Sequence, residues 1–183
     1  MTNVKIHESA DVKSTQIGAG TRVWQFCVIF AAARIGENCN VCSHVLIEDE
    51  VVIGNNVTIK SGVQVWNGVE LEDHVFIGPN VTFTNDIVPR SNNTAFTTSR
   101  TLVQKGASIG ANSTVVAGNV IGAYALVGAG SVVTHSIPAY HLYYGNPARH
   151  RGYVTKEGVL LDMDKKDAEG REYKMLNGEI ISA

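Results

Sequence analysis

Aliphatic or aromatic residues recur at every sixth position through most of this chain, and the interval is kept without a slip over long stretches. One series begins at Ile17 and ends at Phe83, and a second runs from Val103 to Val133. An α-helix repeats near 3.6 residues and an alternating strand near 2, so neither keeps such a series in phase. A coil with three flat sides of six residues does, because each side offers one inward residue to a shared core.

Glycines at equivalent positions support a three-sided coil. Ile17, Ile35 and Ile53 are each followed by glycine, and the pairs recur every eighteen residues, so equivalent corners stack. Hexapeptide repeats are a signature of parallel β-helices, and on this repeat the chain resembles the left-handed β-helix of hexapeptide acyltransferases. The resemblance implies an all-β fold, a left-handed parallel β-helix with one extended loop and a short, strand-rich C-terminal tail.

The repeat also predicts the domain organisation. Residues 1–151 form the expected acyltransferase domain, and 152–183, where the period is lost, form a small cap with short strands at 159–162 and 172–176. The core positions Phe83 and Val103 are separated by twenty residues instead of six, so about fourteen residues leave the prism. This segment is predicted to protrude as a loop over about 85–102, where function usually concentrates.

Composition excludes several classes of partner. The net charge is -2 and the Lys and Arg residues are scattered, which argues against a nucleic-acid partner. No apolar run approaches the roughly 20 residues that span a bilayer, and the N-terminus lacks the apolar region of a signal peptide. The three cysteines, Cys27, Cys39 and Cys42, lack zinc-site spacing and indicate reduced, mostly buried thiols in a cytoplasmic protein without a metal.

Three stretches resemble the acetyl-CoA-dependent sugar acetyltransferases of this class: Ile-Gly-Ala-Asn at 109–112, Val-Gly-Ala-Gly-Ser-Val-Val-Thr at 127–134, and Gly-Asn-Pro-Ala-Arg at 145–149. The resemblance implies that acetyl-CoA is the co-substrate and that its pantetheine arm runs along Ala111 and Ala129. It also implies that Thr134 and Arg149 contact the nucleotide end of CoA. Alternatively, the two alanines merely permit tight stacking of the coils.

The loop bears on the acceptor atom. Val88 aligns with the position at which galactoside and maltose acetyltransferases present a catalytic His, and no His occurs from 75 to 134. A hydroxyl needs a positioned base, worth roughly 10²- to 10⁴-fold. A neutral amine attacks a thioester unaided when it is held in line. The missing His therefore favours N-acylation over O-acylation.

Two runs, Phe-Thr-Asn-Asp-Ile-Val-Pro-Arg-Ser at 83–91 and Val-Cys-Ser-His-Val-Leu-Ile-Glu at 41–48, resemble enzymes that N-acetylate nucleotide-linked 3-amino sugars. The resemblance implies that Asn85 holds the 3-amino group. It also implies that Asn67, eighteen residues earlier, contacts the hexose, although relatives are frequently acidic there. Asp49 extends the column by another eighteen residues, and such polar columns also arise as structural ladders.

Three further residues carry hypotheses, each with a structural alternative. His44 is a second catalytic candidate that hydrogen-bonds the sugar or accepts a proton, unless it is a surface His. Trp66 is a candidate for stacking on the nucleobase or for packing between subunits. Arg90 is a candidate for pairing with the diphosphate, or is solvated. Asn67, Asn85, Arg90 and Trp66 thus form the predicted acceptor site.

The combined resemblance predicts a cytoplasmic homotrimer with active sites between neighbouring prisms. The enzyme would transfer an acetyl group to the 3-amino group of a dTDP-linked 3-amino-3,6-dideoxyhexose for O-antigen or other surface glycans. The alternative acceptor is UDP-2-acetamido-3-amino-2,3-dideoxyglucuronate, and the C4 configuration stays open. Alternatives of other classes are a non-catalytic scaffold and a zinc hydratase; the latter needs three His ligands, whereas His44 and His74 are not separated by a multiple of eighteen.

Overall fold

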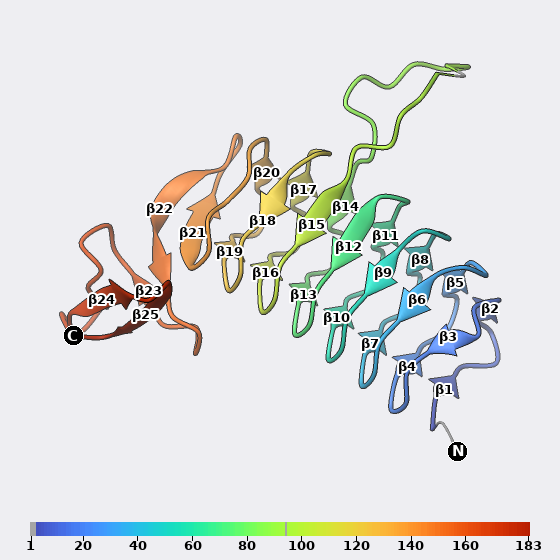
Figure 1. The fold of residues 1–183 in the computed structure, drawn as a ribbon, viewed down its shortest axis with the longest axis horizontal. Coiled ribbons are helices and arrows are strands. Elements are labelled where there is room, and N and C mark those ends of the chain that lie inside the picture. The colour runs from blue at the N-terminus through green and yellow to red at the C-terminus, as the bar shows by residue number, and fades with distance from the viewer. Residues whose placement is uncertain (1–2, 94) are drawn as a thin grey trace.

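The computed structural model describes residues 3–93 and 95–183 and shows a three-sided prism of stacked coils (Figure 1). Met1, Thr2 and Thr94, which belong to the predicted first domain and its loop, lie outside the described residues. Each coil except the last gives one short strand to each side of the prism, and strands of successive coils pair in parallel. The expected β-helix is therefore confirmed.

The strands form three sheets along the prism and one separate hairpin. Sheet 1 has ten strands: β1 (Lys5–Ile6), β4 (Arg22–Val23), β7 (Asn40–Val41), β10 (Thr58–Ile59), β13 (Phe76–Ile77), β16 (Ser108–Ile109), β19 (Leu126–Val127), β21 (His141–Tyr144), β22 (Arg149–Val154) and β23 (Leu160–Leu161). Sheet 2 has seven: β2 (Asp11–Val12), β5 (Val28–Ile29), β8 (Leu46–Ile47), β11 (Gln64–Val65), β14 (Thr82–Phe83), β17 (Thr114–Val115) and β20 (Val132–Val133). Sheet 3 has six: β3 (Gln16–Ile17), β6 (Arg34–Ile35), β9 (Val52–Ile53), β12 (Val69–Leu71), β15 (Thr101–Val103) and β18 (Val120–Ile121).

Within each coil the chain passes from sheet 1 to sheet 2 and then to sheet 3. The three corners are called the 1–2, 2–3 and 3–1 edges. Coils are numbered from the N-terminus, so that coil 1 holds β1 to β3, coil 5 holds β13 to β15, and coil 7 begins with β19. Successive coils lie about 4.8 Å apart, the spacing of hydrogen-bonded strands. Height along the prism can therefore be counted in coils.

The register confirms the eighteen-residue coil. Ile17 pairs with Ile35, one coil later. Across the interruption Val69 pairs with Thr101 and Leu71 with Val103, so the coils stack as though the extra residues were absent. The loop thus leaves the prism without disturbing its frame.

The core contains more than the six-residue series predicts. From Val23 onward the residues of that series are buried, but so is the residue two positions earlier: Val63 and Val65 are both 0% exposed. Each side therefore buries two residues, and the prediction of one was wrong. Cys27 and Cys39 occupy the additional positions, where burial raises the pKa of both thiols, and Cys42 is half-buried. All three thiols are free.

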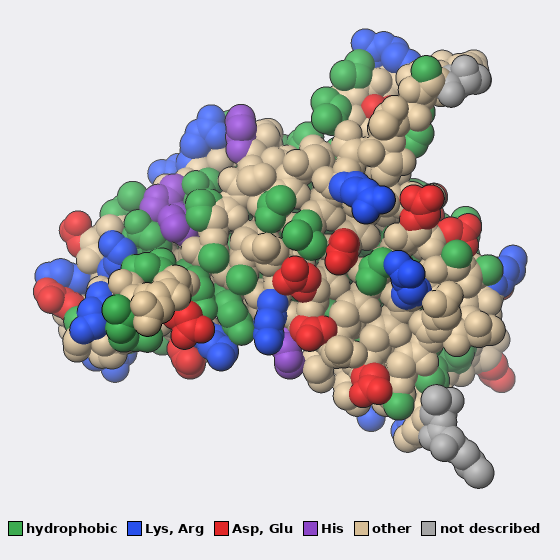
Figure 2. All heavy atoms as spheres, in the orientation of Figure 1, with side chains coloured by type: hydrophobic (Ala, Val, Ile, Leu, Met, Phe, Trp, Pro, Cys, Tyr) green, Lys and Arg blue, Asp and Glu red, His purple; other side chains and the backbone are tan. Residues whose placement is uncertain are grey.

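The loop leaves after β14 and returns at β15, and it stands clear of the prism with hydrophobic and basic side chains along it (Figures 1 and 2). Its predicted end at residue 102 was wrong. Thr101 and Leu102 belong to β15, because they pair with Val69 and Glu70 of the coil below. The backbone N–H of Ser99 donates to the carbonyl of Asn85 at 2.9 Å and closes the base of the loop.

The C-terminal segment turns back on the prism. Strand β22 crosses the predicted boundary at 151 and runs antiparallel to β21, with β23 beside it. A hairpin of β24 (Tyr173–Leu176) and β25 (Glu179–Ser182) follows. Its turn, Asn177-Gly178, holds left-handed backbone at both residues, as two-residue hairpins favour. The predicted strands at 159–162 and 172–176 correspond to β23 and β24.

Within the described residues there is no helix long and apolar enough to cross a membrane. The same residues contain no group of three or more His, Cys, Asp or Glu side chains arranged to hold a metal ion.

Candidate active site

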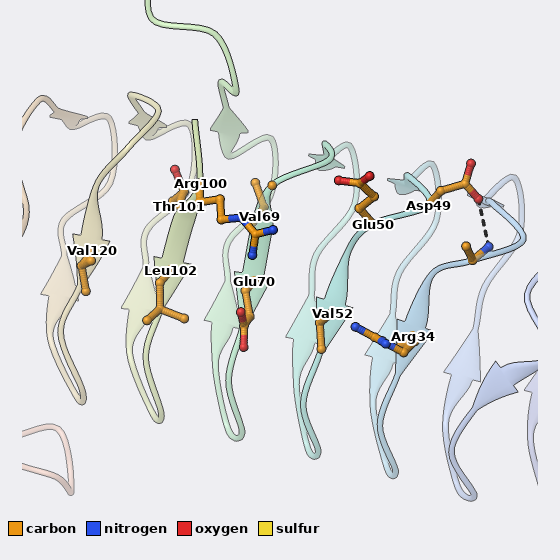
Figure 3. Close-up of a pocket in the computed structure, with 12 residues that line it drawn as sticks. Arg34, Asp49, Glu50, Val52, Val69, Glu70, Arg100, Thr101, Leu102 and Val120 are labelled. Carbon is orange, nitrogen blue, oxygen red and sulfur yellow. Dashed lines mark hydrogen bonds between the residues drawn. The ribbon is translucent and has the colours of Figure 1, made fainter. Parts of the chain in front are cut away.

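The predicted polar column lies on the 2–3 edge. Asp49 Oδ1 accepts the backbone N–H of Ala32 at 2.9 Å, drawn as a dashed line in Figure 3. Asn67 Oδ1 accepts the backbone N–H of Glu50 at 2.9 Å in the same way, one coil higher. Both side chains therefore cap an otherwise unpaired donor of the coil below. This is the ladder that the structural alternative describes.

Asn85, the top member of the column in coil 5, departs from the ladder. Its Nδ2 donates to the backbone carbonyl of Asn67 at 3.3 Å, whereas its Oδ1 has no hydrogen-bond partner among the described residues. Only the NH₂ group of an amide can donate to a carbonyl, so this contact fixes which end faces outward. The loop-closing bond from Ser99 holds the backbone of Asn85 in place. An amide oxygen is thus presented as an acceptor at the root of the loop.

A glycine allows the returning stem of the loop to pass close to this corner. Gly68 holds a backbone φ of +90°, and a Cβ there would lie 2.3 Å from Cγ2 of Thr98. The carbonyl of Gly68 accepts the N–H of Thr101 at 2.9 Å. Any side chain at position 68 would push the stem away from Asn85.

The other predicted acceptor residues lie apart from one another. Trp66 is half-buried at the 2–3 edge and packs against the core. Arg90 is exposed in the loop, where its Nη1 donates to the carbonyl of Pro89 at 2.8 Å. His44 is exposed on the 1–2 edge in coil 3, two coils below the level of Asn85. One chain therefore does not bring His44 and Asn85 together.

Ala111 and Ala129 stack on the 1–2 edge in coils 6 and 7, where the carbonyl of Ala111 accepts the N–H of Gly130 at 2.8 Å. The backbone N–H groups of both alanines form no hydrogen bond within the described chain. Both residues are at least partly exposed. Two unpaired donors thus lie along one small-residue edge, one coil apart.

Thr134 and Arg149 meet at the C-terminal end, although their spacing in the sequence does not predict it. Both line a hollow of about 380 Å³ together with His135 and His150. Burial and the neighbouring His141 lower the pKa of His150. Arg149 supplies this hollow with a positive charge that persists across the ordinary pH range.

A hollow of about 760 Å³ lies on the outer face of sheet 3 beside the 2–3 edge (Figure 3). Asp49 of the polar column lines it, but none of the four residues of the predicted acceptor site does. Arg34 and Arg100 line it together with Glu70, and neither arginine forms a salt bridge within residues 3–93 and 95–183. Sequence reasoning missed this groove. The available signal was charge at outward positions of sheet 3, where the chain carries Arg34 and Glu70.

The candidate residues follow an order along the prism. His44 lies in coil 3, Asn67 in coil 4, Asn85 in coil 5, and Ala111 and Ala129 in coils 6 and 7. They occupy two different edges, however, with Asn67 and Asn85 on the 2–3 edge and the others on the 1–2 edge.

Comparisons with known proteins agree with this architecture. A family model described as bacterial transferase hexapeptide (six repeats) matches residues 50–85. The dTDP-3-amino-3,6-dideoxy-alpha-D-galactopyranose 3-N-acetyltransferase of Aneurinibacillus thermoaerophilus is 54% identical over 176 residues, which cover 94% of this chain and 92% of the relative.

Solved structures give the same picture. A mutant perosamine N-acetyltransferase from Caulobacter crescentus, in complex with CoA and GDP-perosamine, has a TM-score of 0.63 at 27% identity, covering 72% of this chain and 56% of that one. A hexapeptide-repeat acetyltransferase from Vibrio cholerae, complexed with acetyl coenzyme A, has a TM-score of 0.53 at 27% identity and covers 60% of this chain and 63% of its own. With the Aneurinibacillus relative aligned over nearly the whole chain, this protein belongs to the hexapeptide-repeat sugar N-acetyltransferase family.

Proposed function

We propose that this enzyme transfers an acetyl group from acetyl-CoA to the 3-amino group of a dTDP-linked 3-amino-3,6-dideoxyhexose. The observation that carries the proposal is the outward Oδ1 of Asn85, an acceptor suited to an amine N–H, in a chain 54% identical to a dTDP-sugar 3-N-acetyltransferase. The reaction takes place in the cytoplasm, and the product is an N-acetylated sugar donor for O-antigen or other surface glycans.

Asn85 acts by orientation. Its Oδ1 accepts one N–H of the neutral amine and thereby directs the nitrogen lone pair at the thioester carbonyl. A C–N bond forms, negative charge develops on the carbonyl oxygen, and backbone N–H donors stabilise that charge. The C–S bond then breaks; the nitrogen loses a proton and the departing sulfur gains one, which leaves an amide and free CoA.

The 1–2 edge suits the pantetheine arm. The unpaired N–H groups of Ala111 and Ala129 lie one and two coils above the level of Asn85, where the arm would pass. The methyl side chains leave its path open. Thr134 and Arg149 then contact the nucleotide end of CoA, because a guanidinium fork matches phosphate oxygens.

A homotrimer brings the two edges together. We assign the outer face of sheet 2 to the threefold axis, because its outward residues from coil 2 to coil 7 are uncharged, whereas sheets 1 and 3 present Arg22, Arg34 and Glu70. In that arrangement the 1–2 edge of one copy adjoins the 2–3 edge of the next, so each site uses two copies. The uncharged outward residues of sheet 2 are Val28, Leu46, Gln64, Thr82, Thr114 and Val132.

The remaining site residues take supporting roles. Asn67 offers the hexose only its NH₂ group, since its Oδ1 is engaged by Glu50. Arg90 is carried by the loop toward the diphosphate of the substrate, and Trp66 lies beside the hexose at the 2–3 edge. His44 lies two coils from Asn85, about 10 Å along the prism, which favours a binding role over proton transfer.

The test is a panel of acceptors with acetyl-CoA as donor, in which the dTDP-linked 3-amino sugars, the UDP-linked uronic acid and the matching 3-hydroxy sugars are compared. The proposal predicts efficient acetylation of a dTDP-linked 3-amino sugar and none of its 3-hydroxy partner, because no positioned base serves a hydroxyl. Preference for the UDP-linked acid would overturn the nucleotide assignment. Acetylation of the hydroxyl partner would overturn the role given to Asn85, and no turnover of any acceptor would favour a scaffold.

A further inference from the structure

Two aromatic side chains, Phe26 and His44, contact each other on the 1–2 edge in coils 2 and 3. Their ring centroids are 5.1 Å apart with an angle of 44° between the planes. Phe26 is 56% exposed and His44 is exposed as well. The pair therefore presents ring surface to solvent and not to the core.

The backbone under this pair is strained. Phe26 and His44 hold φ angles of 59° and 61°, in the left-handed region that bulky residues avoid. The equivalent positions in other coils are Gly62, Asn80 and Asn112, the residue types that tolerate this conformation. Exposure and strain both oppose stability, so stability does not account for these two rings. Such outliers point to function.

The same chain shows what a pair of this kind does. On the 3–1 edge Tyr124 and Tyr140 also hold left-handed backbone, and their rings stack with centroids 5.2 Å apart. That pair is covered by the C-terminal segment: Tyr140 packs with Leu161 and Ile180. A ring pair on an edge thus packs here under another segment of the protein. The rings of Phe26 and His44 lie at nearly the same centroid distance but are tilted by 44° instead of stacked, and no described segment covers Phe26, which is 56% exposed.

Its position follows from the proposed function, on which this inference rests. CoA occupies the coils above Asn85, so the rest of the acceptor must extend the opposite way, from coil 5 toward coil 2. The hydroxyls of Ser43 and Ser61 lie along that path on the 1–2 edge, 3.1 Å apart. Two to three coils amount to about 10 to 14 Å, a length that a hexose and a diphosphate span together.

We propose that Phe26 and His44 form the platform on which the nucleobase of the sugar nucleotide stacks. Stacking suits any base because every base has a π face. The neighbouring Gln25 has no side-chain hydrogen bond within the described residues, so its amide is available to the donor and acceptor edge of a pyrimidine. The platform takes the stacking role from Trp66, whose ring packs against the core.

Asparagine substitutions test the platform without loss of the fold. Phe26→Asn and His44→Asn remove the rings but install the residue that equivalent positions already carry. His74→Asn is the matched control, because His74 holds the same left-handed conformation, φ 61°, on the 3–1 edge. Phe26→Trp retains a ring. Dissociation constants for dTDP and for CoA are measured separately by calorimetry, together with steady-state kinetics and the oligomeric state by light scattering.

The two platform variants should each weaken dTDP binding about tenfold and raise KM for the sugar nucleotide similarly. The kcat at saturation and the affinity for CoA should stay within about twofold of wild type. His74→Asn should behave like wild type, and Phe26→Trp, which keeps a ring, should bind dTDP more tightly than Phe26→Asn. Unchanged dTDP affinity and KM in an active enzyme would overturn the platform alone. Dissociation of the assembly with loss of CoA binding would assign the rings to a contact between copies. A wild-type protein that binds CoA but neither dTDP nor UDP would overturn the proposed function as well.

Discussion

Replacing Asn85 with alanine tests the proposed mechanism most directly. The side chain forms one hydrogen bond within the described residues, and the mechanism assigns it one more to the substrate. The protein contact is the Nδ2 bond to the carbonyl of Asn67, which is long at 3.3 Å and lies at a surface corner. Its loss should cost about 0.5 to 1 kcal/mol of the free energy of unfolding. The fold should therefore survive the substitution.

The proposed hydrogen bond to the substrate amine should account for the catalytic effect. Without Oδ1 the amine loses both a hydrogen bond and its alignment with the thioester. We expect kcat/KM to fall a hundredfold or more, roughly 3 kcal/mol of transition-state stabilisation. Stopped or coupled assays of CoA release measure the rate. Asn93→Ala is the control: Asn93 lies in the same loop, and among the described residues its Oδ1 accepts the N–H of Ala95 alone.

Asn85→Asp tests the direction in which the pH dependence of the rate shifts. A carboxylate favours the ammonium form of the bound amine and raises the pKa of that amine. Since only the neutral amine attacks, the rate rises with pH through this pKa, and the variant's profile should move to higher pH while KM falls. Activity of Asn85→Ala within threefold of wild type at every pH, in a folded protein, would refute the reasoning.

Three other outcomes follow from the structure. Ala129→Leu should raise KM for acetyl-CoA far more than KM for the sugar, because leucine would fill the path of the pantetheine arm; equal changes in both constants would place CoA elsewhere. Iodoacetamide should label half-buried Cys42 before Cys27 and Cys39, whose thiol pKa values are raised by burial, and peptide mass spectrometry gives the order. Burial acts to raise the pKa of Asp167, but hydrogen bonds from the side chain and backbone of Arg171 and from Tyr173 hold that pKa below its usual range. The stability this provides is present above the pKa of the unfolded state and is lost as the pH falls through the pKa of the folded state. Hydrogen exchange of the C-terminal hairpin should therefore accelerate in acid, and it should accelerate less in Asp167→Asn.

The prism was predictable because aliphatic or aromatic residues recur at every sixth position. The second buried position was not seen, since its early members are Thr21, Cys27 and Ala33, which share small size but not hydrophobicity. The end of the loop was misjudged for a related reason. Thr101 and Leu102 belong to β15 because they pair with Val69 and Glu70 of the coil below, and the loop makes the separation of these partners fourteen residues longer than the eighteen of a regular coil.

The positions of the candidate site residues in the fold were predictable only where these residues follow the repeat. Asn67 and Asn85 stack because eighteen residues make one coil. The orientation of the Asn85 amide depends on the carbonyl below it and on the returning Ser99, which spacing does not encode. The approach of Arg149 to Thr134 depends on a segment outside the repeat, where the N–H of Ala148 bonds to the carbonyl of Val132 at 2.8 Å.

The closure of the loop at its base has a consequence for how such enzymes diversify. Because β12 and β15 pair as direct neighbours, the structure of the prism does not depend on how many residues lie between Phe83 and Thr101. Insertions, deletions or exchange of that whole segment leave Ala111 and Ala129, the proposed CoA contacts, unchanged. The loop can thus be exchanged to change the preference for the acceptor sugar while the proposed CoA-binding coils stay constant. A loop from a relative, inserted between Asn85 and Ser99, whose backbone hydrogen bond closes the loop, should bring its own sugar preference with it.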